Sequence, residues 1–336
     1  MIDDGFGSLS VEQRESIRAA LSAAFGAAPI GVVGRMAGGA TSAAIFRLRV
    51  GERDFVLRAE GAASPLRNPR QYLSMRIAAA AGVAPRLRHV DEVGRVAIMD
   101  YIAAKPLHTF PGGPRALAAA LGALVARLQA TPVFPHFVDY PDIVARLFAH
   151  VRRTGLFAAG LLDRHVERLE QIREAYAAGT TAPVSSHNDC NPRNILYDGA
   201  RLWLIDWESA YRNDPLVDVA IMLDNLARTP DLEELLLQAW LGRAPEDALR
   251  ERLKPVRALT RLYFAGVLLS ASATGSRAAP DDDLSAPGVA SFQSAIRDGR
   301  LKPGTLETKH VMGKMFLAAF LSGDLPPGLD TAIADD

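Results

Sequence analysis

The residues of this chain that could do chemistry gather in one short segment. Asp189 is followed five residues later by Asn194 and, twelve residues beyond that, by Asp206. Residues 195–205 read as two short apolar strands joined at Asp198-Gly199, a strong signal for a two-residue β-hairpin. A hairpin returns the chain on itself, so Asn194 and Asp206 should lie close together. Because carboxylate and amide oxygens suit Mg²⁺, the spacing predicts a magnesium site with a second carboxylate, Asp189, beside it.

This set of side chains is typical of phosphoryl transfer from ATP, which needs positioning and charge neutralisation more than covalent chemistry. In that chemistry Asp189 accepts or orients the proton of the acceptor hydroxyl. Asn194 and Asp206 would hold Mg²⁺ against the nucleotide phosphates. We expect His187 to hydrogen-bond the backbone of this loop or of the segment at Asp206. Asp218 is predicted to brace the same loop by accepting backbone N–H bonds.

Upstream of this segment, the sequence predicts strands separated by a glycine-rich turn. Backbone amides without a neighbouring Cβ can approach phosphate oxygens closely, so the turn is a candidate cover for nucleotide phosphates. A double glycine between strands is also common as a plain turn, and no Gly-Lys-Ser or Gly-Lys-Thr follows, which excludes a P-loop. The predicted strands are 30–36, 44–50 and 53–58, and the predicted phosphate contacts are Gly38, Gly39, Thr41 and Ser42.

The third strand carries a candidate phosphate-binding cation. Period-two alternation places Val56 and Arg58 on one face, as in kinases that hold phosphates with a strand cation, although Arg replaces the usual Lys. The alternative for Arg58 is a solvated charge at the strand end. The helix predicted at 69–81 should carry a Glu to pair with the cation, but no acidic residue lies between Gly61 and Val90. Gln71 is the nearest polar candidate.

The segment that follows two further predicted strands reads as a hinge between two lobes. Met99 and Tyr101 would lie where backbone groups bind adenine, after which helical patterns dominate. We therefore expect an α+β, two-lobed fold. Residues 1–101 would form a nucleotide-binding lobe with an antiparallel sheet, and residues 102–336 a larger, mostly helical catalytic and substrate-binding lobe.

Composition narrows the class of protein. Hydrophobic residues make up 49% and charged residues 23% of the 336, which is ordinary for a globular protein. The formal net charge of zero argues against nucleic-acid binding. Cys190 is the only cysteine, so no intrachain disulfide is possible and a reducing compartment is natural. With no signal peptide and no apolar run long enough for a membrane span, we expect a cytoplasmic protein without membrane partners.

The motifs resemble one known family. Three segments are similar to the choline/ethanolamine kinase branch of the aminoglycoside phosphotransferase-like superfamily. They are His187-Asn188-Asp189 through Asn194, Ile205 to Glu208, and Asn213 to Asp218. Asn after the His, Glu208 two residues after the metal Asp, and Arg58 on the third strand favour this branch. The resemblance implies a two-lobed protein-kinase-like fold, ATP, Mg²⁺ and transfer to the hydroxyl of a small alcohol.

Within that resemblance, a choline-type ammonium group would need an aromatic wall and a carboxylate. The candidates are Glu208, Tyr211, Asp224, Trp240 and Tyr263. The aromatic ones would also suit the core of any helical lobe. Two alternatives remain: a phosphotransferase of the same fold that acts on an aminoglycoside or another small alcohol, and a pseudokinase that binds nucleotide as a scaffold. The missing helix acid favours the scaffold, whereas the intact Asp189, Asn194 and Asp206 oppose it.

Overall fold

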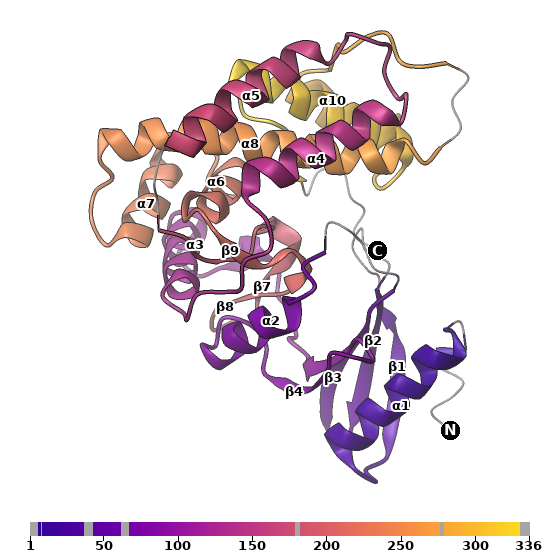
Figure 1. Ribbon diagram of the computed structural model, residues 1–336. Coiled ribbons are helices and arrows are strands. Elements are labelled where there is room, and N and C mark those ends of the chain that lie inside the picture. The colour runs from indigo at the N-terminus through magenta and orange to yellow at the C-terminus, as the bar shows by residue number, and fades with distance from the viewer. Residues whose placement is uncertain are drawn as a thin grey trace.

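The computed structural model describes residues 6–7, 9–36, 43–61, 67–178, 182–275 and 279–329. Figure 1 shows a sheet lobe at one end of the molecule and a layer of long helices at the other. This confirms the predicted two-lobed α+β fold. The strands of the sheet lobe are β1 (Ile30–Met36), β2 (Ala44–Val50), β3 (Arg53–Ala59), β4 (Leu87–Asp91) and β5 (Val96–Asp100).

The sheet is antiparallel, with strand order β1-β2-β3-β5-β4. Helix α1 (Val11–Phe25) begins at a capping box between Ser10 and Gln13 and packs beside β4 and β5. Alternate residues of β3, namely Phe55, Leu57 and Ala59, are buried in one hydrophobic cluster with α1. Since successive strand residues point to opposite faces, the residues between them face away from this core.

Helix α2 (Gln71–Ala80) packs against the short helix η4 (Trp207–Ser209). Its buried Tyr72, Met75 and Ala78 belong to the large hydrophobic cluster of the helical lobe. This helix therefore connects the sheet to the predicted site segment. The lobe boundary at residues 101 and 102 stays a prediction.

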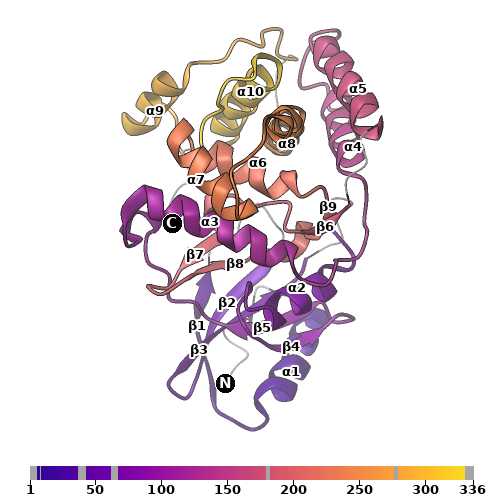
Figure 2. The ribbon, with the colours of Figure 1, turned by 90° about the vertical axis from the view of Figure 1, so that its left-hand side faces the viewer.

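The helical lobe is built around one long central helix, α8, which contacts α4, α6 and α10 (Figure 2). Helix α8 runs through Pro255 without interruption. Burial of its apolar residues on both sides of Pro255 offsets a cost of about 3 kcal/mol for an interior proline.

The helices of this lobe are α3 (Gly113–Gln129), α4 (Tyr140–Arg153), α5 (Asp163–Ala178), α6 (Leu216–Asn225), α7 (Pro230–Leu241), α8 (Asp247–Ser272), α9 (Val289–Arg297) and α10 (Leu306–Ser322).

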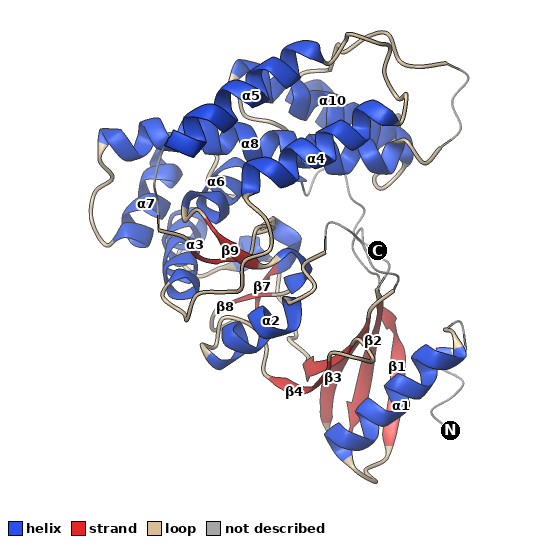
Figure 3. Cartoon of the chain, viewed as in Figure 1, coloured by secondary structure: helices blue, strands red, loops and turns tan. Residues whose placement is uncertain are grey.

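Two pairs of short strands lie between the lobes (Figure 3). Strand β6 (Val184–Ser186) pairs with β9 (Tyr211–Asn213), and β7 (Ile195–Tyr197) pairs with β8 (Leu202–Leu204). The predicted hairpin is present, but its loop has four residues, 198–201, instead of two. The carboxylate of Asp198 accepts hydrogen bonds from the backbone N–H groups of Ala200 and Arg201 at 2.7 and 2.8 Å, which stabilises the wider turn.

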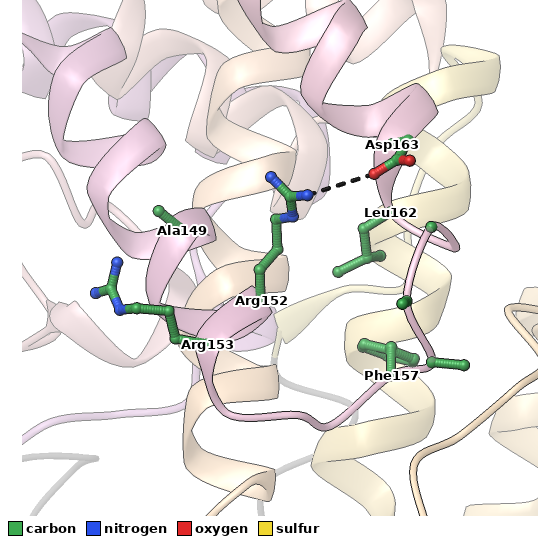
Figure 4. A pocket seen from close by; sticks show the side chains of 9 residues that line it. Ala149, Arg152, Arg153, Phe157, Leu162 and Asp163 are labelled. Carbon is green, nitrogen blue, oxygen red and sulfur yellow. Dashed lines mark hydrogen bonds and ion pairs between the residues drawn. The ribbon is translucent and has the colours of Figure 1, made fainter.

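A cavity of about 400 Å³ lies between the end of α4 and the start of α5 (Figure 4). Arg152, Arg153, Phe157 and Leu162 line it, and an ion pair joins Arg152 to Asp163. None of the side chains predicted to do chemistry lines this cavity. In the described part of the chain, no helix combines the length and the apolar composition needed to cross a membrane.

Candidate functional site

The loop that carries Asp189 is fixed by one buried carboxylate at the start of α6. Asp218 is fully buried and accepts hydrogen bonds from the backbone N–H groups of His187 at 2.9 Å and Asn188 at 2.7 Å. The ring of His187 bonds the carbonyl of Ile205 at 2.8 Å through Nε2. Burial lowers the pKa of His187, which keeps the ring neutral. The hydrogen bonds predicted for His187 and Asp218 are therefore present.

Asn188 holds this loop to the segment that follows Asp206. Its backbone is left-handed, with φ of 62°, and its side chain is buried. The amide group donates to the carbonyl of Ser209 at 2.9 Å, and its oxygen accepts from Ser186 at 2.9 Å and from Asn213 at 2.7 Å. Asn tolerates this backbone conformation better than most residues. Asn188 therefore adopts the left-handed backbone that the turn needs and also supplies hydrogen-bond partners to its buried polar neighbours.

Replacing Asn188 with Gly is expected to keep the left-handed turn but to leave these polar groups without partners. We expect the free energy of unfolding to fall by about 2–4 kcal/mol, since each buried group left unsatisfied costs about 1–3 kcal/mol. Denaturant unfolding measures this loss. Asn188→Ala should be less stable still, by about 1 kcal/mol, because Ala carries a Cβ into the left-handed region. A Gly variant as stable as the natural chain would contradict this account of the loop.

The side chains of Asp189 and Asn194 are directly hydrogen-bonded. Nδ2 of Asn194 donates to the carboxylate of Asp189 and to its main-chain oxygen, each at 2.9 Å. Asn191 donates to the other carboxylate oxygen at 2.8 Å. Burial raises the pKa of Asp189 to about 8, and the charges of Asp206 and Glu208 contribute to the rise. The carboxyl group is thus oriented by two amides and lies in a site with an excess of negative charge.

Asp206 lies next to this pair, as the hairpin predicted. The N–H of Ile205 donates to the carbonyl of Asn194 at 3.0 Å, which ties the entrance of the hairpin to its exit. Asp206 has a left-handed backbone, with φ of 66°, and precedes η4. Its carboxylate accepts a hydrogen bond from Arg58 at 2.7 Å, and Glu208 accepts another from the same guanidinium at 2.9 Å. The strand cation and the predicted metal ligand therefore meet across the lobes.

The donor set fits the Mg²⁺ that the sequence predicts. Nδ2 of Asn194 is committed to Asp189, so the amide oxygen is the atom left for a cation. With the carboxylate of Asp206 it offers hard oxygen ligands, and Mg²⁺ usually completes such a set with water and substrate phosphates. Arg58 covers the Asp206 carboxylate, so a metal ion would have to share or displace this partner. No cluster of three or more His, Cys, Asp or Glu side chains suited to a metal occurs in the described ranges.

The remaining predicted nucleotide contacts lie on β3 and at the end of β5. Val56 pairs with Met99 across these strands and lies on the same face of β3 as Arg58. The N–H of Tyr101 already donates to the carbonyl of Asp54 at 3.2 Å, so it is not free for adenine. The ring of Tyr101 lies 4.2 Å from the guanidinium of Arg47. Gly38, Gly39, Thr41 and Ser42 lie outside the described residues.

Of the aromatic candidates, Tyr263 lies close to Asp189, and Tyr211 lies close to Tyr263. Burial and the charge of Asp189 raise the pKa of Tyr263, and burial and Tyr263 raise the pKa of Tyr211. The ring of Tyr140, which the sequence did not single out, lies 5.9 Å from that of Tyr263. Three buried tyrosines, from α4, β9 and α8, therefore lie beside the loop that carries Asp189.

Asp224 and Trp240 do not fit the substrate role predicted for them. Asp224 is buried, and its two oxygens pair with Arg257 at 2.6 Å and Arg261 at 2.7 Å, so its charge is already neutralised within the helical core. Trp240 donates to Gln129 at 2.8 Å where α7 packs on α3. Both residues stabilise helix packing.

The acid that pairs with Arg58 is not on the helix where it was expected. Gln71 makes no hydrogen bond to Arg58; instead Glu60, two residues after Arg58, binds its Nε at 2.7 Å. Arg67 binds the second oxygen of Glu60 at 2.7 Å and approaches Glu208 at 3.4 Å. The period-two pattern that paired Val56 with Arg58 extends to residue 60 and could have identified this acid.

The sequence model of the phosphotransferase enzyme family (APH) matches residues 33–256, about two thirds of the chain. The chain belongs to this family. Among curated proteins, Protein LicA of Haemophilus influenzae is 37% identical over 57 residues, which are 17% of this chain. The matched segments span only 14% to 21% of the lengths of the curated relatives.

Solved structures share the fold over most of the chain. A choline/ethanolamine kinase family protein of Mesorhizobium loti superposes with a TM-score of 0.65 at 23% identity, covering 92% of this chain and 95% of that one. LicA in complex with AMP gives 0.63 at 15% identity, covering 91% and 98%. A thermostable mutant of aminoglycoside phosphotransferase APH(4)-Ia gives 0.57 at 16% identity, covering 88% and 95%. At these identities the likeness establishes the fold.

Proposed function

We propose that this protein is an ATP-dependent kinase that transfers the γ-phosphate to the hydroxyl of a small alcohol, of the choline or ethanolamine type. The observation that carries the proposal is the convergence of Asp189, Asn194 and Asp206 at one point, opposite Arg58 on β3. Membership of the phosphotransferase family supports the reaction class. The similarity to LicA in complex with AMP supports a nucleotide as the phosphate donor.

In the proposed reaction the acceptor oxygen bonds to the γ-phosphorus while the bond from this phosphorus to the bridging oxygen of ADP breaks. The acceptor proton passes to the carboxylate of Asp189, which Asn191 and Asn194 hold in place. Arg58 supplies positive charge to the phosphates from the sheet lobe. A Mg²⁺ ion held by Asn194 and Asp206 would neutralise charge on the phosphate oxygens.

A cationic acceptor suits the electrostatics of the site. Asp189, Asp206 and Glu208 interact with one another, and burial first, then these neighbouring carboxylates, raise the pKa of Asp189 to about 8 and that of Glu208 to about 7. The ammonium group of an amine alcohol would supply positive charge there. Tyr263, which is 8% exposed and interacts with Asp189, is the aromatic candidate for contact with this group, whereas Tyr211 is only 2% exposed. A cation–π contact contributes about 0.5–2 kcal/mol.

A panel of acceptors tests this proposal. ATP turnover with Mg²⁺ should be stimulated most by choline, ethanolamine or a related amine alcohol, and less by uncharged alcohols of the same size. Stimulation by aminoglycosides alone would overturn the choice of acceptor and keep the reaction. Nucleotide binding without stimulation by any alcohol would instead support a scaffold role.

A further inference from the structure

Glu60 lies at the inner end of β3, directly beside Arg58. Its side chain is 1% exposed and that of Arg58 is 7% exposed, and their ion pair measures 2.7 Å. Because side chains two residues apart on an extended chain share a face, both point away from the Phe55 and Leu57 core and toward Asp206. The extended backbone is therefore enough to bring the side chains of Arg58 and Glu60 together.

The guanidinium of Arg58 divides its donors between two sides. Nε binds Glu60, whereas the two amino groups bind Asp206 at 2.7 Å and Glu208 at 2.9 Å. Glu60 therefore fixes the plane of the guanidinium, and the amino groups point across the lobes at the segment that carries the predicted metal ligand. A planar fork with several fixed donors suits phosphate as well as carboxylate.

Helix α2 offers no charge to this cation. Gln71 and Tyr72 begin the helix and are both buried, and among the described residues neither the amide oxygen of Gln71 nor the hydroxyl of Tyr72 has a hydrogen-bond partner. Arg67, just before the helix, binds the other oxygen of Glu60 at 2.7 Å. The carboxylate is therefore held between two arginines, and the helix contributes only neutral groups.

We propose that Glu60 is the positioning residue for Arg58 in nucleotide binding. When phosphates replace Asp206 and Glu208 at the amino groups, the bond from Nε to Glu60 remains. Glu60 directly follows β3, two residues after Arg58, and its N–H donates to the carbonyl of Arg95 at 3.0 Å. Both partners therefore move with the sheet, and movement of α2 or of one lobe against the other does not separate them. The cation is then oriented before nucleotide arrives, independently of the helix. This inference rests on the proposed function, since it assumes that the protein binds a nucleotide.

The test is the dissociation constant of ADP with Mg²⁺, measured by titration calorimetry without an acceptor. Glu60→Gln keeps the shape of the side chain and removes its charge. We expect its affinity for ADP to fall about 10- to 100-fold, the loss typical when a residue that orients a binding group is removed. In steady-state assays the KM for ATP should rise by a similar factor, with kcat changed less.

A matched control separates positioning from loss of a buried charge. Asp281 also pairs with two basic side chains, His310 at 2.6 Å and Lys314 at 3.2 Å, and it lies in the helical lobe. Asp281→Asn should lower the unfolding temperature without changing the affinity for ADP. If Glu60→Gln does not fold, Glu60→Asp, which keeps the charge and withdraws it by one methylene, should fold and show a smaller loss of affinity.

The outcomes distinguish this inference from the proposed function. If Glu60→Gln binds ADP as tightly as the natural chain, the role of Glu60 is overturned and the kinase proposal stays intact. If only Glu60→Asp folds, unchanged affinity for ADP in that variant has the same meaning. A fall in affinity equal to that of Asp281→Asn would also overturn the role of Glu60. Absence of ADP binding in the natural chain would instead contradict the proposed function.

Discussion

Replacing Asp189 with Asn is expected to lower kcat about 10²- to 10⁴-fold, the usual contribution of a positioned general base. Asn has the same shape and can keep a contact with Asn194, and the loop stays fixed because Asp218 binds backbone N–H groups at positions 187 and 188. The fold and the affinity for nucleotide should therefore change little. Steady-state kinetics with a saturating amine alcohol measure the loss. A variant that keeps kcat within tenfold of the natural value would remove Asp189 from the reaction.

The same residue gives the reaction a pH dependence. Burial first, and then neighbouring carboxylates, raise the pKa of Asp189 to about 8 and that of Glu208 to about 7. A protonated carboxyl group cannot accept a proton, so kcat/KM should fall as the pH drops through this range. A bound cation favours the ionised form and should shift the acid limb to lower pH. The residual kcat/KM of Asp189→Asn should no longer show the fall at low pH that comes from protonation of Asp189.

Replacing Asp206 with Ala is expected to abolish the effect of Mg²⁺ on nucleotide binding. In the natural chain the affinity for ATP should rise when Mg²⁺ is added. In the variant this gain should fall by at least about 10- to 100-fold, a loss found even when indirect partners of a metal are removed. The carboxylate is the one charged oxygen ligand that we assign to the metal. Titration of ATP with and without Mg²⁺ measures the effect.

Metal-free binding is the internal control for this variant. Asp206→Ala also removes one partner of Arg58, but Glu60 and Glu208 still bind the same guanidinium. Affinity for ATP without Mg²⁺ should therefore stay equal or increase, because the amino group released from Asp206 can bind phosphate. If the gain from Mg²⁺ is the same in the variant and in the natural chain, the metal assignment is wrong.

The sheet lobe could be predicted closely because its signals are local. Alternating apolar residues and glycine-containing turns place the first three strands within one residue of their observed ends. The loop from His187 to Asn194 and the hairpin after it were also evident, since their polar residues lie close together in the sequence. The hairpin loop was predicted too short because the side chain of Asp198 stabilises four residues.

The parts that could not be predicted depend on distant partners. Asp224 looked available to a substrate, but Arg257 and Arg261, more than thirty residues later on α8, neutralise it. The acid that pairs with Arg58 is the exception, because Glu60 lies only two residues away and the period-two pattern includes it.

The most direct test of the central claim is to identify the products formed from ATP, Mg²⁺ and an amine alcohol by mass spectrometry. We predict one phosphorylated alcohol for each ADP, with Asp189→Asn forming both products at least about 100-fold more slowly. ADP formed without a phosphorylated alcohol, or ATP bound but unchanged with every acceptor, would contradict the assignment of this site to phosphoryl transfer.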